Sequence, residues 1–143
     1  MRYLVATDGS EESKAAVRYA TTHALAFDAE IELVHVLIPK TQTVEQTAVF
    51  EGEDAMMDTG ERILSESADV VAEVAEDHGR SVEVETTLLT GRPAHAIAAR
   101  AERADATAIY VGHRGLANDR QAVVGSVAKG VVDRAEVPVT IVR

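Results

Sequence analysis

Three glycines and a serine near the C-terminus have a spacing that suits phosphate binding. Two residues separate Gly112 from Gly115, and nine more precede Gly125 and Ser126. Glycine lets a backbone approach a ligand closely, and the start of a helix presents free N–H groups and the positive end of its dipole to anions. A helix that begins at Ser126 would therefore form a phosphate site that contains no lysine.

Several other chemistries are excluded by what the sequence lacks. It has no Gly-Lys-Ser/Thr of a Walker A loop and no Gly-x-Gly-x-x-Gly of a dinucleotide-binding fold. Ser126 does not lie in a Gly-x-Ser-x-Gly nucleophile elbow, and the histidines do not have the spacing of metal ligands. Because the chain has no cysteine, disulfides, thiolate metal sites and a cysteine nucleophile are excluded.

The elements that must position these residues alternate between strands and helices. We expect strands at residues 2–7, 31–37, 82–89, 107–111 and 137–142, helices after Ser10, at 54–78, from Pro93 and at 126–135, and loops at 39–52 and 112–124. The strict alternation predicts a single domain over residues 1–143. Its fold class is α/β: a doubly wound open parallel sheet in the order 3-2-1-4-5, with four helices on both faces.

Helical spacing predicts which side chains face the sheet, and punctuating residues predict the helix ends. Ser10 is the expected N-cap of the first helix, Gly79 closes the second, and Pro138 favours an edge position for the last strand. The expected inward residues are Val17, Ala20, Ala24, Phe27, Leu64, Ala68, Val71, Ala75, Ala94, Ile97, Ala98, Ala101, Ala128, Val131, Val132 and Ala135.

Topology places the candidate site independently of the glycine motif. Ligands of doubly wound sheets bind beyond the carboxyl ends of the strands, where the strand order reverses. In the order 3-2-1-4-5 this point lies between the first and fourth strands. The loops at residues 7–10 and 112–115 are therefore the predicted site.

The same segments resemble a known family, the universal stress proteins, over essentially the whole chain. The resemblance is carried by Leu-Val-Ala-Thr-Asp-Gly-Ser at residues 4–10, Val-His-Val at 34–36, Gly-Arg-Pro at 91–93, Val-Gly-His-Arg-Gly-Leu at 111–116, Gly-Ser-Val at 125–127 and Val-Pro-Val at 137–139. The glycine spacing resembles that of the ATP-binding subgroup.

The resemblance implies a site for ATP accompanied by Mg²⁺, and a homodimer formed through the final strand at residues 137–142. By resemblance, Asp8 and Val36 lie near the adenine, with the backbone of Ala6 and Thr7 nearby, and Gly112 meets the ribose. The implied phosphate contacts are Gly115, Gly125, Ser126 and Val127. His113 and Arg114, within the same loop, complete the candidate set.

Ordinary structural roles remain open for these residues. Asp8 can satisfy backbone donors in the strand-to-helix turn, Gly112 and Gly115 can be turn glycines with positive φ, and Ser126 can be an N-cap. Arg114 either reaches a phosphate or lies in solvent. His113 has no partner positioned by the sequence, so it is expected at the polar loop surface rather than as a general base.

The distribution of charge argues against several partners. Residues 45–85 carry a net charge of −11 and residues 86–143 carry +3, within a total of −10. An acidic surface with five aromatic residues disfavours nucleic acid and anionic membranes. No apolar run reaches the ~20 residues of a membrane span, and the N-terminus does not resemble a signal peptide, so we expect a cytoplasmic protein. Eleven arginines and three lysines against 24 acids favour a halophilic origin.

These observations favour an ATP-binding universal stress protein that acts as a homodimeric, nucleotide-responsive module of the stress response, without catalytic residues. Two alternatives remain open. One is a slow ATPase, for which Arg114, Lys129 and Arg120 are the nearest cations. The other is a nucleotide-free dimerisation module in which the glycines only turn the chain.

Overall fold

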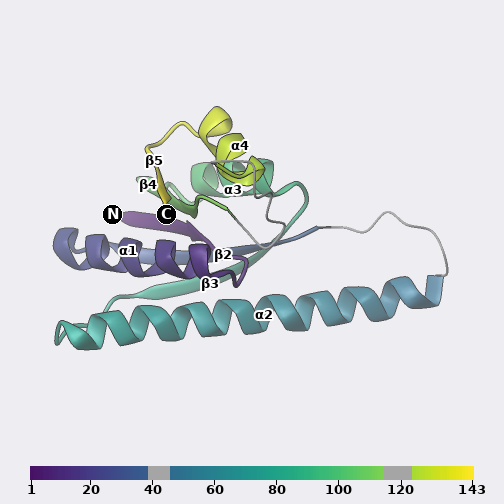
Figure 1. Ribbon diagram of the computed structural model, residues 1–143, viewed down its shortest axis with the longest axis horizontal. Coiled ribbons are helices and arrows are strands. Elements are labelled where there is room, and N and C mark those ends of the chain that lie inside the picture. The colour runs from purple at the N-terminus through teal and green to yellow at the C-terminus, as the bar shows by residue number, and fades with distance from the viewer. Residues whose placement is uncertain (39–45, 115–123) are drawn as a thin grey trace.

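The strands form one parallel sheet in the order β3-β2-β1-β4-β5, which confirms the predicted topology. The computed structural model describes residues 1–38, 46–114 and 124–143, and of residues 46–51 and 53 it describes the backbone alone (Figure 1). The strands are β1 (Arg2–Ala6), β2 (Glu30–Leu37), β3 (Val84–Thr90), β4 (Ala108–Gly112) and β5 (Val139–Val142). The strands β3 and β5 are the edges of the sheet, as predicted for the last strand.

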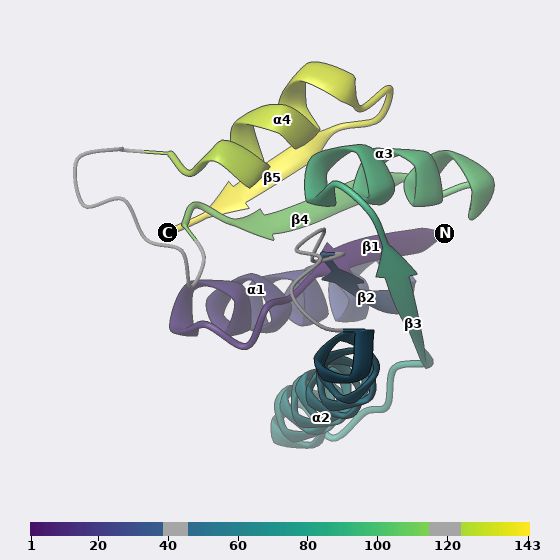
Figure 2. The same ribbon diagram turned by 90° about the vertical axis from the view of Figure 1, so that its right-hand side faces the viewer.

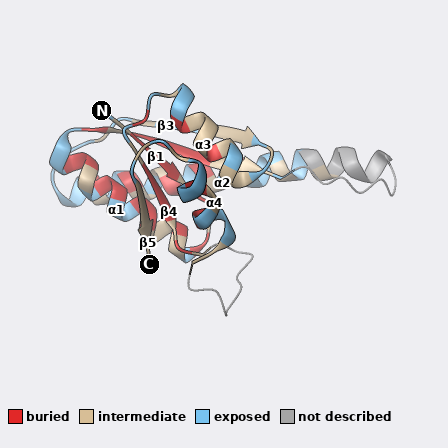
Figure 3. Cartoon of the chain, turned by 90° about the horizontal axis from the view of Figure 1, so that it is seen from above, coloured by how far each residue is buried: buried red, intermediate tan, exposed pale blue. Residues whose placement is uncertain are grey.

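Helices cover both faces of the sheet (Figure 2). They are α1 (Glu11–Phe27), α2 (Gln46–Asp77), α3 (Pro93–Arg103) and α4 (Ser126–Arg134). The helices α1 and α2 pack on one face, and α3 and α4 on the other. Each face buries its own apolar cluster, so the burial is concentrated in the strands and on the inner sides of the helices (Figure 3).

The turn from β1 into α1 is fixed by local hydrogen bonds. The side chain of Ser10 accepts the backbone N–H of Ser13 at 3.1 Å, which confirms Ser10 as the N-cap. Glu11 and Glu12 in the first turn interact favourably with the helix dipole. Gly9 has a φ of +83°, a conformation that side chains with a Cβ rarely adopt, so the tight turn requires glycine. This turn sets the position of residues 7–10.

The helix α2 begins earlier than predicted. The expected loop at residues 39–52 is wrong from Gln46 onward, because that residue starts a 32-residue helix whose N-terminal part projects beyond the sheet (Figure 1). A helical segment that covers no sheet needs no apolar stripe, so periodicity does not reveal it. Its other end is as expected: Gly79 has a φ of +66°, and the N–H of Arg80 reaches the carbonyl of Ala75.

Two of the predicted inward residues are exposed. Phe27 is 62% exposed because Leu25, rather than Phe27, continues the buried side of α1. Val132 is 49% exposed because α4 buries only a narrow side that includes Ala128 and Val131. The remaining predicted positions are buried or half-buried, so helical spacing identified the sheet-facing side of every helix.

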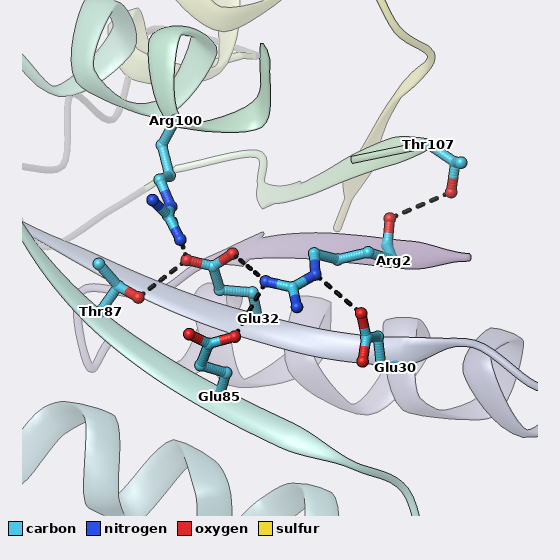
Figure 4. Close-up of polar contacts among 7 residues, drawn as sticks. All are labelled: Arg2, Glu30, Glu32, Glu85, Thr87, Arg100 and Thr107. Carbon is cyan, nitrogen blue, oxygen red and sulfur yellow. Dashed lines mark hydrogen bonds and ion pairs between the residues drawn. The ribbon is translucent and has the colours of Figure 1, made fainter. Parts of the chain in front are cut away.

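A buried carboxylate ties together three strands and a helix toward the amino end of the sheet (Figure 4). Glu32 of β2 has a fully buried side chain, and its oxygens accept hydrogen bonds from Arg100 Nε at 2.7 Å, Thr87 Oγ1 at 2.8 Å and Arg2 Nη1 at 2.9 Å. Burial by itself raises the pKa of Glu32, but the hydrogen bonds from these three partners outweigh it and the pKa is lowered. We call Arg2, Glu32, Thr87 and Arg100 the Glu32 network.

Candidate functional site

The predicted site lies where the carboxyl ends of β1 and β4 meet side by side. After β1 the chain passes to α1 on one face, and after β4 it leads to α4 on the opposite face (Figure 2). This divergence is the strand-order reversal at which doubly wound folds bind ligands. The structure therefore brings the loop at residues 7–10 and the residues from Gly112 to Arg114 to one edge.

At the end of β1, Asp8 stabilises the turn. Its Oδ1 accepts the N–H of Ser10 at 2.9 Å, a local turn that aspartate forms readily. Its backbone N–H lies 3.3 Å from the Ser13 hydroxyl, and the side chain is half-buried. The structural role that the sequence left open for Asp8 is therefore present.

A cluster of buried hydroxyls behind Asp8 was not expected from the sequence. Thr7 Oγ1 lies 3.2 Å from Ser13 Oγ and 3.0 Å from Ser67 Oγ, and Ser13 Oγ donates to the carbonyl of Ser10 at 3.0 Å. The ring of His35 also contacts this strand end, with Nδ1 2.8 Å from the carbonyl oxygen of Thr7. Because Ser67 is 60 residues from Thr7 along the chain, only the tertiary fold reveals this cluster.

At the end of β4, Gly112 is required by packing. A Cβ at this position would lie 2.8 Å from the carbonyl carbon and 2.9 Å from the carbonyl oxygen of Glu12. The backbone of Gly112 thus approaches the first turn of α1 too closely for any side chain. Gly112 has no positive φ, so the turn-glycine alternative is wrong here.

The next two residues form a side-chain pair. His113 is only 8% exposed, so the prediction of a polar surface position is wrong. Its Nε2 lies 3.0 Å from Nε of the half-buried Arg114, which donates to it. Within the part of the chain that the structure describes, its Nδ1 is buried and has no hydrogen-bond partner. Arg114 is therefore not free in solvent, because its guanidinium is hydrogen-bonded to the ring of His113.

The start of α4 lies against the end of β4. Gly125 is the N-cap, with φ −69° and ψ 161°, and its N–H donates to the carbonyl of His113 at 2.5 Å. The N-cap alternative for Ser126 is therefore wrong: Ser126 is the first residue of the helix and is exposed, as is Val127. Among the residues that the structure describes, no side chain caps this helix start. Gly115, the fourth motif residue, lies outside the described residues.

The other two predicted residues line the sheet. Ala6 is the last residue of β1 and Val36 lies near the end of β2, and both pack against the apolar cluster under α3 and α4. Val36 lies in β2, the strand next to β1 in the sheet, and pairs with Leu89 of β3 on its other side. Its side chain is thus part of the core, as expected for either interpretation.

A groove of about 260 Å³ lies between the start of α3 and α4, and its lining runs along α4 from Ser126 to Arg134. Ser126 and Val127 line one side, and Arg92, His95 and Arg134 add basic side chains to a protein whose net charge is −10. The two helices can approach closely because Gly130 has no side chain. A Cβ at this position would lie only 2.5 Å from Cβ of Ala94. This contact explains the glycine within α4.

The charged groups that an ATPase or a metal site would need are not gathered together among the described residues. Of the three cations considered for an ATPase, Arg114 donates to His113, Lys129 is exposed on α4, and Arg120 lies outside the described residues. Among the described side chains, no group of three or more His, Asp or Glu residues could hold a metal ion. In the same residues, no helix has the length and apolarity needed to cross a membrane.

Comparison with known proteins assigns the chain and its fold to one family. The sequence profile of the universal stress protein family matches residues 1–143. A universal stress protein of Methanocaldococcus jannaschii is 30% identical over 149 residues, which cover 99% of this chain and 81% of that protein.

Solved structures give the same result. A universal stress protein from Archaeoglobus fulgidus has a TM-score of 0.77 and 25% identity, covering 100% of this chain and 93% of that one. A universal stress protein solved in complex with cAMP has a TM-score of 0.76 and 26% identity, covering 100% of this chain and 97% of that one. This chain therefore belongs to the universal stress protein family.

Proposed function

We propose that this protein binds an adenine nucleotide, ATP in the cell, at the carboxyl edge of the sheet between β1 and β4. The observation that carries the proposal is the uncapped start of α4, which lies against the end of β4 with Gly125 N–H 2.5 Å from the carbonyl oxygen of His113. Free N–H groups and a helix dipole at a strand-order reversal favour a phosphate. A relative of 26% identity has been solved with cAMP, an adenine nucleotide.

The resemblance then assigns parts of the nucleotide to residues. Asp8 and Val36 would lie near the adenine, together with the backbone of Ala6 and Thr7, and Gly112 near the ribose. The phosphates would meet Gly115, Gly125, Ser126 and Val127. The exposure of Ser126 and Val127 supports this assignment, because a ligand can reach them without moving a helix.

The basic groove supports a polyphosphate rather than a monophosphate. Arg92 and His95, at the start of α3, line the same groove as Ser126, into which the second and third phosphates of ATP would extend. Arginine suits phosphate because its planar guanidinium presents several donors in fixed geometry. The described residues contain no metal-binding cluster, so Mg²⁺ would enter on the phosphates and partly neutralise them.

We further propose that the nucleotide acts through a homodimer. The edge strand β5 is hydrogen-bonded to β4 on one side only, so its other side can pair with a second copy. Nucleotide binding would change dimer geometry or partner contacts only by the difference in its affinity for the two states. Equilibrium sedimentation should give about twice 15.3 kDa, and a monomeric mass would contradict the dimer.

The experiment for nucleotide binding is calorimetric titration of the purified protein, in molar KCl, with AMP, ADP and ATP, with and without Mg²⁺. The informative variant is Ser126→Asp, which places a carboxylate where a phosphate would bind. Acidic residues stabilise the first turn of a helix, so this variant should fold at least as well as wild type. We expect its affinity for ATP to fall at least tenfold.

The matched control is Ser65→Asp on the exposed side of α2, which adds the same charge away from the site. Its affinity should equal that of the wild type, because screening in molar salt limits charge effects to about 3 Å. Equal losses in both variants would indicate a general charge effect. Failure of the wild type to bind any of the three nucleotides would contradict the proposed function.

A further inference from the structure

His113 is a buried polar residue whose orientation follows from the pairing of β4 with β5. Its N–H donates to the carbonyl of Val142 at 2.8 Å, so the ladder continues one residue beyond Gly112. Side chains alternate along a strand. The Cβ position of Gly112 faces α1, whereas Val111 packs in the cluster under α3 and α4. His113 therefore lies on the same face as Val111, the face from which α4 starts.

The contact with Arg114 determines which ring nitrogen carries the proton. Arginine has donors and no acceptor, so Nε of Arg114 donates to Nε2 of His113 at 3.0 Å. An Nε2 that accepts a hydrogen bond is unprotonated, and the proton of the neutral ring must then be on Nδ1. Arg114 thus holds His113 in the tautomer whose Nδ1–H is a donor.

This donor lacks an acceptor in the described structure. Nδ1 is buried, and none of the described residues pairs with it. A buried donor without a partner destabilises the folded state, and such groups are rare in native structures. By contrast, the backbone carbonyl of the same residue accepts the N–H of Gly125. The residue that carries this donor is therefore hydrogen-bonded through its backbone to the N-cap of α4, a helix start that no described side chain caps.

We propose that the Nδ1–H of His113 donates a hydrogen bond to a phosphate oxygen of the bound nucleotide, and that Arg114 is the positioning residue that fixes the tautomer. This inference rests on the proposed function and makes it more specific. His113 thereby adds to the phosphate contacts proposed at the start of α4 and favours ligands that carry a phosphate over the corresponding nucleoside. The contacts proposed at Asp8 and Val36 recognise the part that the two ligands share.

The test compares AMP with adenosine, because the two differ only in the phosphate. Titration of the wild type, His113→Phe and His113→Asn with both ligands measures the contribution of the donor. Phenylalanine fills the ring volume without a donor, whereas the amide nitrogen of asparagine is as many bonds from Cα as Nδ1 of histidine is. A hydrogen bond to a charged group contributes about 1.5–3 kcal/mol, which corresponds to roughly 10-fold to 150-fold in affinity.

We expect His113→Phe to bind AMP at least tenfold more weakly than the wild type and adenosine within twofold of it. His113→Asn should restore most of the affinity for AMP. Equal losses for AMP and adenosine, or unchanged AMP affinity in His113→Phe, would overturn the inference and leave the proposed function intact. Binding of neither ligand to the wild type would overturn both.

A second measurement on the wild type does not depend on the folding of a variant. Nitrogen-15 NMR of the histidine rings should place the proton of His113 on Nδ1 in the free protein. Addition of AMP should shift the Nδ1 resonance, and addition of adenosine should not. Replacement of Arg114 by Met should let the proton move to Nε2. A proton already on Nε2 in the free wild type would contradict the assigned role of Arg114.

Discussion

Toward the amino end of the sheet, both oxygens of the buried Glu32 carboxylate accept hydrogen bonds, whereas at the carboxyl end the buried ring of His113 has one nitrogen without a partner among the described residues. Both groups are polar, both are buried, and each contacts an arginine. The difference is that three groups of the fold itself complete the first site. The second is incomplete, and a ligand can complete it.

This difference separates a structural site from the proposed binding site. The Glu32 network links β1, β2, β3 and α3, so its hydrogen bonds are formed whenever the protein is folded. At His113 and the start of α4, donors remain available at folding. A ligand that satisfies them stabilises the folded state in proportion to its concentration and affinity. Changes at the two ends should therefore affect different measurements.

The largest effect on stability is expected from Arg100→Met. Methionine retains much of the length of the side chain but leaves Glu32 buried with fewer donors. Loss of one partner from a buried ion pair commonly costs 3–5 kcal/mol; because Arg2 and Thr87 remain, we expect about 3 kcal/mol in the free energy of unfolding. Urea denaturation at pH 7 measures it.

The matched control is Arg103→Met, which removes an exposed arginine from the same helix. It should change the free energy of unfolding by no more than about 0.5 kcal/mol. Nucleotide affinity should be unchanged in both variants, because the Glu32 network lies away from the site. A loss of AMP binding in folded Arg100→Met would break the separation of the two ends.

Gly112→Ala tests whether the carboxyl edge tolerates added volume. The new Cβ would lie 2.8 Å from the backbone of Glu12, so α1 or β4 must shift. Overpacking of this kind costs about 1–3 kcal/mol, and we expect about 2 kcal/mol together with weaker nucleotide binding. Gly52→Ala is the control: nothing lies within 4 Å of its Cβ position in α2, so it should stabilise by up to about 1 kcal/mol.

The fold could be predicted from the sequence because its signals are periodic and local. Alternating strands and helices gave the order of the sheet, and Ser10 and Gly79 marked helix ends through backbone chemistry that involves only neighbouring residues. The prediction failed where no local requirement exists. The start of α2 projects beyond the sheet, and Phe27 was placed in the core although Leu25 continues the buried side.

The site was predicted less completely than the fold. Topology and the glycine spacing correctly predicted that residues 7–10 and 112–114 meet at one edge, but Gly112 accommodates the backbone of Glu12, and Gly125 replaces Ser126 as the N-cap. The burial of His113 depends on how α4 and β5 meet the end of β4. No pattern of neighbouring residues contains that information, so its unsatisfied nitrogen appears only in the structure.

Acid should weaken the Glu32 network at the amino end of the sheet. The hydrogen bonds lower the pKa of Glu32 below its unfolded value of about 4.3, so their stabilisation is complete above that pH and is lost as the pH falls through the lower folded value. Glu32→Gln has no carboxyl group at this position to protonate, so its stability does not include this pH-dependent contribution. Its free energy of unfolding should therefore fall less steeply than that of the wild type below about pH 4.3. The difference between the two curves should be smaller than the loss of stability expected for Arg100→Met at pH 7. Parallel curves would contradict the direction of the pKa change.

The smallest effect is expected at Ser67, and it tests whether the carboxyl edge is open throughout or only at β4. Ser67→Ala removes the hydroxyl 3.0 Å from Thr7 Oγ1, which retains its contact with Ser13 at 3.2 Å. We expect a loss of about 1 kcal/mol relative to Ser65→Ala, an exposed serine of the same helix that corrects for helix propensity.

AMP affinity should be unchanged in Ser67→Ala, because the buried hydroxyls around Thr7 are satisfied by one another, whereas the donor at His113 has no partner among the described residues. Thermal unfolding with and without AMP measures both quantities in one experiment. If the ligand stabilises Ser67→Ala much less than Ser65→Ala, the end of β1 depends on α2 to hold Asp8 for the ligand. The boundary between structure and binding would then lie within the carboxyl edge itself rather than between the two ends of the sheet.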